Sequence, residues 1–307
     1  MNAQTTLPVT TNSKPQVSIG MPVYNGAKFI REALDSLLAQ TFTDFELIIS
    51  DNASTDETEA ICREYAAKDK RIHYIRQREN LGATANFKYV LDEAVGEYFM
   101  WAAADDVWDK NWLAVLYPVA RENNCLAFGT VRAIDEAGQM VHHPANNRLF
   151  SYTGIRLLRR IKYALEPNIL GKANPIYSVF PKELIDEDAV NVLSSGVFAA
   201  DTFLLYNALK QCQIKGTKAV CLHKRIHPGC AGGEACASDR ITIFDKLRRF
   251  FMANIRCFCA NLKNYGELSA PLERVVITAG LPLSMVYGIA IQVLNQLYRS
   301  PVVKPES

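Results

Sequence analysis

The first third of the chain alternates between two hydrophobic patterns. Short apolar runs of strand type occupy residues 17–24, 45–50, 71–76 and 98–102, and each is too short for a helix. The segments between them carry apolar residues at helical spacing, so we expect helices at 29–39, 55–67 and 83–94. This alternation with short connections predicts an α/β fold, in which a mostly parallel sheet has helices on both faces.

Polar residues mark the ends of these predicted elements. The run Ser54-Thr55-Asp56-Glu57 has the S-x-x-E form of a capping box, which predicts that the second helix begins at about Thr55. The carboxyl ends of parallel strands meet at one edge of a sheet, where open α/β proteins bind their ligands. We therefore expect Tyr24, Asp51 and Asp105, which lie at or just beyond three strand ends, to be close together.

The strand at 98–102 stands out because two adjacent carboxylates, Asp105 and Asp106, follow it closely. Oxygen ligands at such a strand end suit Mg²⁺ or Mn²⁺ carried by a phosphate-bearing substrate. We interpret the pair as a metal–diphosphate site. The alternative is a solvated Asp-Asp turn that caps the helix expected near Asn111.

After the acidic pair, strands and helices alternate less regularly. We expect helices at 111–124, 156–164 and 203–210, strands at 126–134, 176–180 and 217–222, and a turn at 135–138. These elements are predicted to extend the sheet and to build the pocket for a second substrate. From residue 241 onward the pattern is helical, so we place a boundary near residue 240.

Composition narrows the class of protein. The 307 residues are 49% hydrophobic and 21% charged, which is ordinary for a soluble globular protein. A formal net charge of +2 gives no general affinity for nucleic acid. The eight cysteines form no C-x-x-C pair and no secretory signal precedes them, so we expect reduced thiols and a cytoplasmic protein. The first sixteen residues read as a flexible leader.

Four short motifs occur in a fixed order: P-V-Y-N at 22–25, D-N-A-S-T-D at 51–56, E-N-L-G-A-T-A-N at 79–86 and A-A-A-D-D-V-W at 102–108. Together they resemble the family 2 glycosyltransferases of the GT-A fold, closely over 16–110 and loosely over 125–230. The resemblance implies a catalytic domain at 17–240, with a nucleotide-sugar half at 17–110 and an acceptor half at 111–240. A helical extension at 241–307 would follow it.

The resemblance also implies how a nucleoside diphosphate sugar is held. The residue at Asp51 would accept an N–H of the nucleotide base, a task that suits a carboxylate because it has only acceptor lone pairs. Pro22, Tyr24 and Asn25 would line a uridine or thymidine pocket, and Asn86 would lie on the sugar-diphosphate side. For Tyr24 the alternative is a buried core aromatic.

The acidic motif departs from the family's commonest form, because Ala103 occupies the first acidic position. We assign Asp105 to the metal, as it matches the second acid, and Asp106 to orienting the ribose or the donor sugar. An ion bound by a diphosphate keeps several waters and needs only one or two protein carboxylates, so Mg²⁺ or Mn²⁺ remains the expected cofactor.

Inversion at the anomeric carbon requires a base for the attacking hydroxyl, and by resemblance we assign it to Asp201 in the run S-G-V-F-A-A-D-T-F-L-L. The competing interpretation is a helix N-cap. If Asp201 is not the base, the other candidates are Glu183, Asp186 and Asp188. Arg225 and His227 resemble a basic cluster that closes over the donor diphosphate, and His227 could instead ligate the metal.

The sequence therefore predicts an inverting transferase that moves a sugar from a UDP- or dTDP-sugar to a saccharide or lipid-linked saccharide acceptor. The alternatives are a nucleotidyltransferase of similar fold and a catalytically inactive nucleotide-sugar binding module, the latter suggested by Ala103. Residues 240–263 mix Lys and Arg with Phe and Ile, and residues 275–298 carry no charge. We therefore expect peripheral membrane contact through 241–298, at the cytoplasmic face of the membrane. The alternatives are that 275–298 spans the membrane, since 24 uncharged residues are long enough, or that both segments pack as ordinary helices on the catalytic domain.

Overall fold

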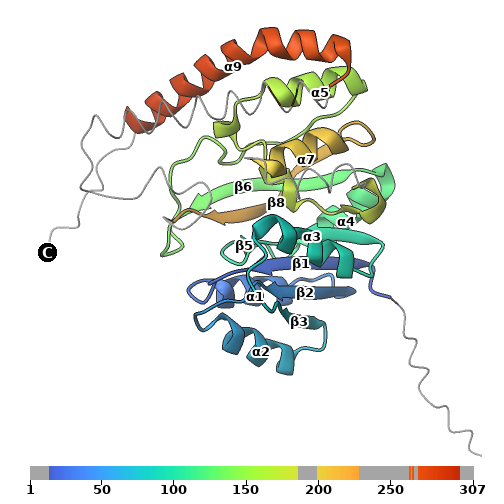
Figure 1. Cartoon of the computed structure of the whole chain (residues 1–307), viewed down its shortest axis with the longest axis vertical. Helices are drawn as coiled ribbons and strands as arrows, with labels where there is room; N and C mark the ends of the chain where they lie inside the picture. The colour runs from blue at the N-terminus through green and yellow to red at the C-terminus, as the bar shows by residue number, and fades with distance from the viewer. Residues whose placement is uncertain (1–13, 186–198, 228–262, 264, 266–268, 298–307) are drawn as a thin grey trace, which may run out of the picture.

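The computed structural model describes residues 14–185, 199–227, 263, 265 and 269–297. Its larger sheet has the strand order β3-β2-β1-β4-β7 (Figure 1). Strands β1 to β4 run parallel, whereas β7 pairs antiparallel with β4. Their bounds are β1 Val17–Val23, β2 Phe45–Asp51, β3 Ile72–Arg76, β4 Tyr98–Trp101 and β7 Phe180–Pro181. The predicted α/β class and mostly parallel sheet are confirmed.

Helices connect these strands as the hydrophobic pattern predicted. Helix α3 packs on β1 and β2, α2 packs on β2 and β3, and α1 packs on α2. Their bounds are α1 Ile30–Leu38, α2 Thr58–Lys68, α3 Ala83–Glu93 and α4 Trp112–Asn123. The apolar stripe expected for the first helix is its buried face, which contains Ile30, Ala33, Leu34 and Leu37.

A second, three-stranded sheet has the order β5-β8-β6. Its strands are β5 Val107–Trp108, β6 Leu126–Ile134 and β8 Ile214–Arg225. β6 and β8 run parallel, and the two-residue strand β5 pairs antiparallel with β8, with Val107 opposite His223. Because β5 begins directly after Asp106, this pairing sets the acidic pair beside the carboxyl end of β8.

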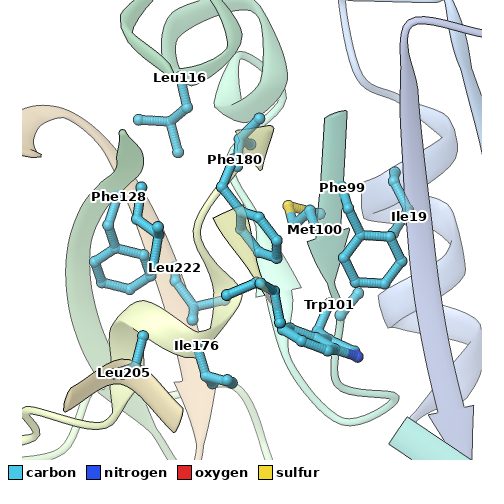
Figure 2. Packing of buried hydrophobic residues seen from close by; sticks show 14 of the residues in the cluster. Ile19, Phe99, Met100, Trp101, Leu116, Phe128, Ile176, Phe180, Leu205 and Leu222 are labelled. Carbon is cyan, nitrogen blue, oxygen red and sulfur yellow. The ribbon is translucent and has the colours of Figure 1, made fainter. Parts of the chain in front are cut away.

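An aromatic core joins the two sheets (Figure 2). Trp101 of β4 is fully buried and contacts Phe99 and Phe180, with ring centroids 5.0 and 5.7 Å apart. Trp112 of α4 meets Phe128 of β6 edge-on at 5.4 Å. Edge-to-face contacts between buried rings add to the stabilisation that burial provides. This core fixes β4 and β6, and so fixes where the acids between them lie.

Three local predictions are wrong for identifiable reasons. The strand expected at 176–180 is reduced to β7, because Pro175 opens a 3₁₀ helix, η2 Asn174–Tyr177, and Pro181 cannot donate a ladder hydrogen bond. The expected capping box does not form, because the Ser54 hydroxyl accepts the Asn25 N–H and α2 begins three residues later than predicted, at Thr58. The strand expected at 217–222 is longer than predicted and runs from Ile214 to Arg225.

Helices α5 Arg156–Leu165 and α9 Pro271–Leu297 lie at one end of the molecule, and α7 Ala200–Ala208 lies between α5 and the second sheet (Figure 1). The short 3₁₀ helices are η1 Asn168–Leu170 and η3 Lys182–Leu184, and η3 follows β7. Helix α9 packs along α5 and η1, away from α2. The leader up to residue 13, the boundary near residue 240 and the helix expected at 241–262 lie outside the described residues.

Candidate functional site

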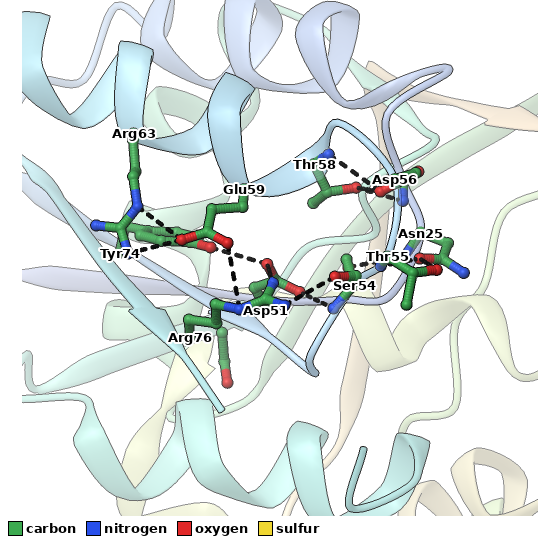
Figure 3. A network of polar contacts seen from close by, with 12 residues as sticks. Asn25, Asp51, Ser54, Thr55, Asp56, Thr58, Glu59, Arg63, Tyr74 and Arg76 are labelled. Atoms are coloured by element: carbon green, nitrogen blue, oxygen red, sulfur yellow. Dashed lines mark hydrogen bonds and ion pairs between the residues drawn. The ribbon is translucent and has the colours of Figure 1, made fainter. Parts of the chain in front are cut away.

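The loops after β1 and β2 are tied together at the carboxyl edge of the larger sheet (Figure 3). Asn25 has a positive φ of 51°, a conformation that Asn tolerates better than most residues. Its N–H donates to the Ser54 hydroxyl over 2.9 Å, and its side-chain oxygen accepts the Thr55 N–H over 2.8 Å. Tyr24 beside it is 50% exposed, so it is not the buried core aromatic of the alternative interpretation. Pro22 is half-buried on β1.

Asp51 lies at the end of β2 with no exposed surface. One carboxylate oxygen accepts the Ser54 N–H over 2.8 Å, and the other accepts the Tyr74 hydroxyl over 2.8 Å and an Arg76 Nη1–H over 3.0 Å. Burial, together with the charge of Asp51, raises the pKa of Tyr74, which keeps this hydroxyl a donor. Base binding by Asp51 stays a prediction, and it requires a neighbour such as Arg76, whose side chain is 32% exposed, to move aside.

Asn86 points back into the fold. It is 3% exposed, its amide nitrogen donates to the backbone oxygen of Ser50 over 2.8 Å, and its amide oxygen accepts the Ser50 hydroxyl. The structure thus shows Asn86 as the clamp between α3 and β2, beneath the surface where a donor would lie. A direct contact with the sugar diphosphate stays a prediction.

Asp105 and His227 form the exposed part of the acidic site. The His227 Nε2 lies 2.9 Å from the Asp105 Oδ2, and the two side chains are 16% and 28% exposed. The His227 ring also packs on Phe29, with centroids 4.9 Å apart. The sequence placed these residues in separate motifs, and the structure brings them together as one oxygen and one nitrogen donor that share an open side.

Asp106 has a different environment. It is 1% exposed, its Oδ1 accepts the backbone N–H of Arg225 over 2.8 Å, and its Oδ2 has no hydrogen-bond partner among the described residues. Burial and the neighbouring charge of Asp105 raise the pKa of Asp106 to about 7. A buried carboxylate oxygen without a partner is costly, so this carboxyl is suited to receiving a proton, a cation or a donor group.

These side chains fit a divalent ion only if a substrate supplies most of its ligands. The described residues contain no group of three His, Cys, Asp or Glu side chains that could hold a metal by themselves. Mg²⁺ and Mn²⁺ bound by a diphosphate need just one or two protein ligands, and carboxylate oxygens are the protein ligands that suit both ions. Asp105, with His227 beside it, meets that requirement, and the unpartnered Asp106 oxygen adds negative charge close by.

Arg225 has a place that the sequence did not suggest. Its side chain has no exposed surface. The guanidinium donates to the backbone oxygens of Asp105, Asp135 and Glu136 over 2.9 to 3.0 Å and to the carboxylate of Glu32 over 2.5 Å. It joins α1, the acidic pair and the turn after β6. Diphosphate binding by Arg225 stays a prediction, and it would require these hydrogen bonds to break.

Asp201 lies in the first turn of α7, as its second residue. It is not the N-cap, because that position belongs to Ala199, which has a positive φ of 60°. The Asp201 Oδ1 accepts the Thr202 N–H over 2.7 Å. Burial raises the pKa of Asp201, and the positive charge of Lys224 opposes that rise. A carboxylate with a raised pKa is better matched to accepting a proton.

Lys224 is the residue that the sequence reasoning missed. It extends from β8 to donate to the side-chain oxygen of Asn174 over 2.9 Å, with its Nζ 5.8 Å from the Tyr177 ring centroid. Its charge acts on both Asp106 and Asp201. Successive residues of a strand point to opposite faces of the sheet. This alternation could have indicated that Lys224 and the buried Arg225 lie on different faces of β8.

The alternative candidates for the base are less well placed. Glu183 lies in η3, where the preceding Lys182 donates its N–H to the backbone oxygen of Glu97. Glu183 is thus beside the amino end of β4, whereas Asp105 and Asp106 follow its carboxyl end. Asp186 and Asp188 lie outside the described residues.

Residues 18–180 match the family model described as Glycosyl transferase family 2. The chain belongs to this family. Among curated members, it is 36% identical over 115 residues to the putative teichuronic acid biosynthesis glycosyltransferase TuaG of Bacillus subtilis, a match that covers 38% of this chain and 46% of that protein. The chain spans about half or less of the length of the curated family members that it matches.

Two solved structures share the fold. TarS 1–349 of S. aureus in complex with UDP superposes with a TM-score of 0.55 at 16% identity, covering 95% of both chains. The mannosyltransferase PcManGT of Pyrobaculum calidifontis, in complex with GDP-Man and Mn²⁺, gives a TM-score of 0.57 at 17% identity, covering 94% of this chain and 77% of the other. The GT-A fold expected for a family 2 glycosyltransferase is thereby confirmed.

The contacts of Arg225 generate a stability prediction. We expect Arg225→Met to lower the free energy of unfolding by roughly 3 kcal/mol, because buried backbone oxygens lose their donors. The matched control is Lys224→Met on the same strand, which removes one hydrogen bond from a half-buried side chain and should cost less than about 1 kcal/mol. Urea unfolding followed by circular dichroism measures both. Equal losses would contradict the role given to Arg225.

Proposed function

We propose that this family 2 protein transfers a sugar, with inversion, from a UDP- or dTDP-sugar to an acceptor hydroxyl in the synthesis of a cell-surface polysaccharide or glycolipid. One observation carries the proposal. The partly exposed Asp105–His227 pair, the unpartnered Asp106 oxygen and the half-buried Asp201 all lie around the carboxyl end of β8. The positive charge of Lys224 on that strand lowers the pKa of both Asp106 and Asp201. The proposed donor-binding acid and the proposed base would therefore share one neighbouring cation.

Several relatives support the substrate class. TarS has been solved with UDP and with UDP-GlcNAc, and PcManGT with GDP-Man and Mn²⁺. The name of TuaG refers to teichuronic acid, and EpsE of Bacillus subtilis, a putative glycosyltransferase, is 30% identical over 165 residues. We infer a nucleoside diphosphate sugar as donor and a saccharide or lipid-linked saccharide as acceptor.

The donor would lie across the loops after β1 and β2, with Pro22, Tyr24 and Asn25 around the base. The Asp51 carboxylate offers about four lone-pair positions, and three of them already accept hydrogen bonds. Because Asp51 has no exposed surface, a base N–H would reach the carboxylate only if a neighbour such as Arg76 moves aside. Asn86 would act from below by holding α3 against β2.

Asp105 and His227 would hold a divalent ion together with the donor diphosphate. When bound, the ion would neutralise the negative charge that develops on the leaving diphosphate. Asp106 would orient the ribose or the donor sugar through its unpartnered Oδ2, which can accept a hydroxyl hydrogen bond.

Asp201 would take the proton of the acceptor hydroxyl. Its Oδ1 is held by the Thr202 N–H, which leaves Oδ2 as the atom that faces the acceptor. The raised pKa increases the basicity of the carboxylate, while Lys224 keeps enough of it ionised to act. Tyr177 and Asn174, which contact Lys224, would line the acceptor site.

We also propose that the protein works at the cytoplasmic face of a membrane, where a lipid-linked acceptor is available. The basis is the mixture of Lys, Arg and Phe at 240–263 and the uncharged stretch at 275–298. Helix α9 contains a segment, Pro271–Ile291, that is long and apolar enough to cross a bilayer by length and composition alone.

A thermal-shift screen of nucleoside diphosphates and their sugars, with and without Mn²⁺, tests the donor class. The set should contain uridine, thymidine and guanosine nucleotides. We expect a larger rise in melting temperature with Mn²⁺ and a diphosphate together than with either alone. If a nucleotide sugar binds but no saccharide or lipid-linked saccharide acceptor yields a product, the protein is better described as the inactive nucleotide-sugar binding module suggested by Ala103.

The assignment of the base predicts the effect of Asp201→Asn. This change keeps the oxygen that accepts the Thr202 N–H but removes the proton acceptor, so turnover should fall by about 10²–10⁴-fold while donor affinity is retained. Release of nucleoside diphosphate in the presence of acceptor measures the turnover, and calorimetric titration measures the donor affinity. Glu183→Gln, on the opposite end of β4, is the control and should remain within a few-fold. A loss of only a few-fold in Asp201→Asn would place the base elsewhere.

The charge of Lys224 predicts a shift in the pH profile. Burial holds the pKa of Asp201 above its ordinary value and Lys224 lowers it, so removing the cation must raise the pKa further. Because the base acts only when deprotonated, the acidic limb of kcat should move to higher pH in Lys224→Met and stay in place in Lys224→Arg. An unmoved limb in Lys224→Met would show that Lys224 does not act on the base.

A further inference from the structure

Over residues 271–291, where the structure describes the side chains, helix α9 is fixed to the protein by one face. Its buried positions recur at helical spacing: Glu273, Ile277, Leu281 and Gly288. The glycines allow close approach, because an added Cβ at Gly280 would lie 2.7 Å from a methyl group of Leu165, and one at Gly288 would lie 3.1 Å from Pro167. This face therefore fits closely along α5 and η1.

A buried ion pair locks the start of α9. Arg160 of α5 and Glu273 of α9 pair with side chains that are each 4% exposed. The Arg160 guanidinium lies 4.1 Å above the Tyr206 ring, and the Tyr206 hydroxyl hydrogen bonds with Ser269. Separating α9 from α5 would leave a buried charge without its partner, which is strongly unfavourable.

The opposite face of α9 is apolar and exposed. Its large side chains are 39% to 75% exposed, and they form one stripe along the helix: Leu272, Val275, Val276, Leu283, Val286 and Tyr287. On the neighbouring α5, Leu158 is 60% exposed, and Ile155, just before that helix, is 69% exposed. An exposed apolar surface of this length is unusual in a soluble protein and indicates an interaction site.

The charges of α5 and α9 indicate the kind of partner. Within the residues that the structure describes in α5 and α9, Glu273 is the only acid, and it is buried. The exposed charged side chains of these two helices are cations: Arg156, Lys162 and Arg274. A two-fold contact with a second copy would bring like charges together, whereas a bilayer with anionic headgroups would neutralise them.

We propose that α9 lies flat on an anionic lipid bilayer and does not cross it. The exposed stripe would enter the boundary between headgroups and acyl chains, and the cations of α5 and α9 would meet the headgroup phosphates. The α5 contact excludes a spanning orientation, because it would draw the charged side chains of α5 toward the hydrocarbon or require the Arg160–Glu273 pair to break. This inference rests on the proposed location of the protein at a membrane and states how the protein would bind there. It does not depend on the proposed transfer reaction.

Vesicle sedimentation of the full-length protein tests the partner. We expect binding to phosphatidylcholine vesicles that contain phosphatidylglycerol to be at least about tenfold stronger than to phosphatidylcholine alone. The double change Leu283→Glu with Val286→Glu should weaken that binding by at least about tenfold. Val95→Glu, at a position 49% exposed in the connection between α3 and β4, is the matched control and should bind like the wild type.

Bromolipid quenching of introduced tryptophans tests the orientation. Positions 272 and 283 lie on the same stripe, about 16 Å apart along the helix axis. In Leu272→Trp and Leu283→Trp we expect the same shallow depth, and the native tryptophans, each 3% exposed or less, should contribute little. Melting temperatures identify any variant that fails to fold, and Val275→Trp or Val286→Trp on the same stripe then replaces it, so that two depths can still be compared.

Three outcomes would overturn the proposal. Unequal depths at 272 and 283 would show a spanning helix. Equal sedimentation of the wild type and the double variant would show that the stripe does not meet lipid. A concentration-dependent doubling of mass by light scattering, abolished by the double variant and unaffected by vesicles, would assign the stripe to a second copy of the chain.

Discussion

The guanidinium of Arg225 is the contact on which the candidate site depends. It belongs to the second sheet, yet its hydrogen bonds reach helix α1 of the first sheet, the backbone of Asp105 and the turn after β6. The backbone N–H of the same residue holds Asp106. Since a buried guanidinium must satisfy its donors, the segments around it have little freedom to shift. The two halves of the chain are thus joined at the point where the acids lie.

Around that contact, three carboxylates differ by environment. Asp105 is partly exposed beside His227, Asp106 is buried with one oxygen unpartnered, and Asp201 lies on a separate helix with a raised pKa. Exposure suits a metal ligand that must exchange with a substrate, and burial suits a carboxyl whose proton affinity is raised. Under the proposed function, these different environments would let the acids take different parts in binding the donor and activating the acceptor.

The sequence predicted much of the fold because its signals were local. Strand and helix periods located β1 to β4 and the helices between them, and the acids after β4 and on α7 were found as motifs. What failed depended on distant contacts. The Ser54 hydroxyl accepts the Asn25 N–H and forms no capping box. The buried position of Arg225 and the hydrogen bond from Lys224 to Asn174 also depend on which face of β8 is covered, which the sequence pattern did not reveal. The face of α9 that packs on α5 is likewise a tertiary property.

The proposed donor site depends on Asp105, with His227 beside it, as the residue that would hold the metal of a donor diphosphate. Electron paramagnetic resonance of Mn²⁺ tests it most directly, because free and bound ions give different signals. With a nucleoside diphosphate that binds the protein, we expect Mn²⁺ binding that Asp105→Ala weakens by at least about tenfold, while Asp92→Ala on the exposed face of α3 leaves it unchanged. Diphosphate-dependent Mn²⁺ binding of equal strength in Asp105→Ala and the wild type would show that Asp105 is not the metal ligand.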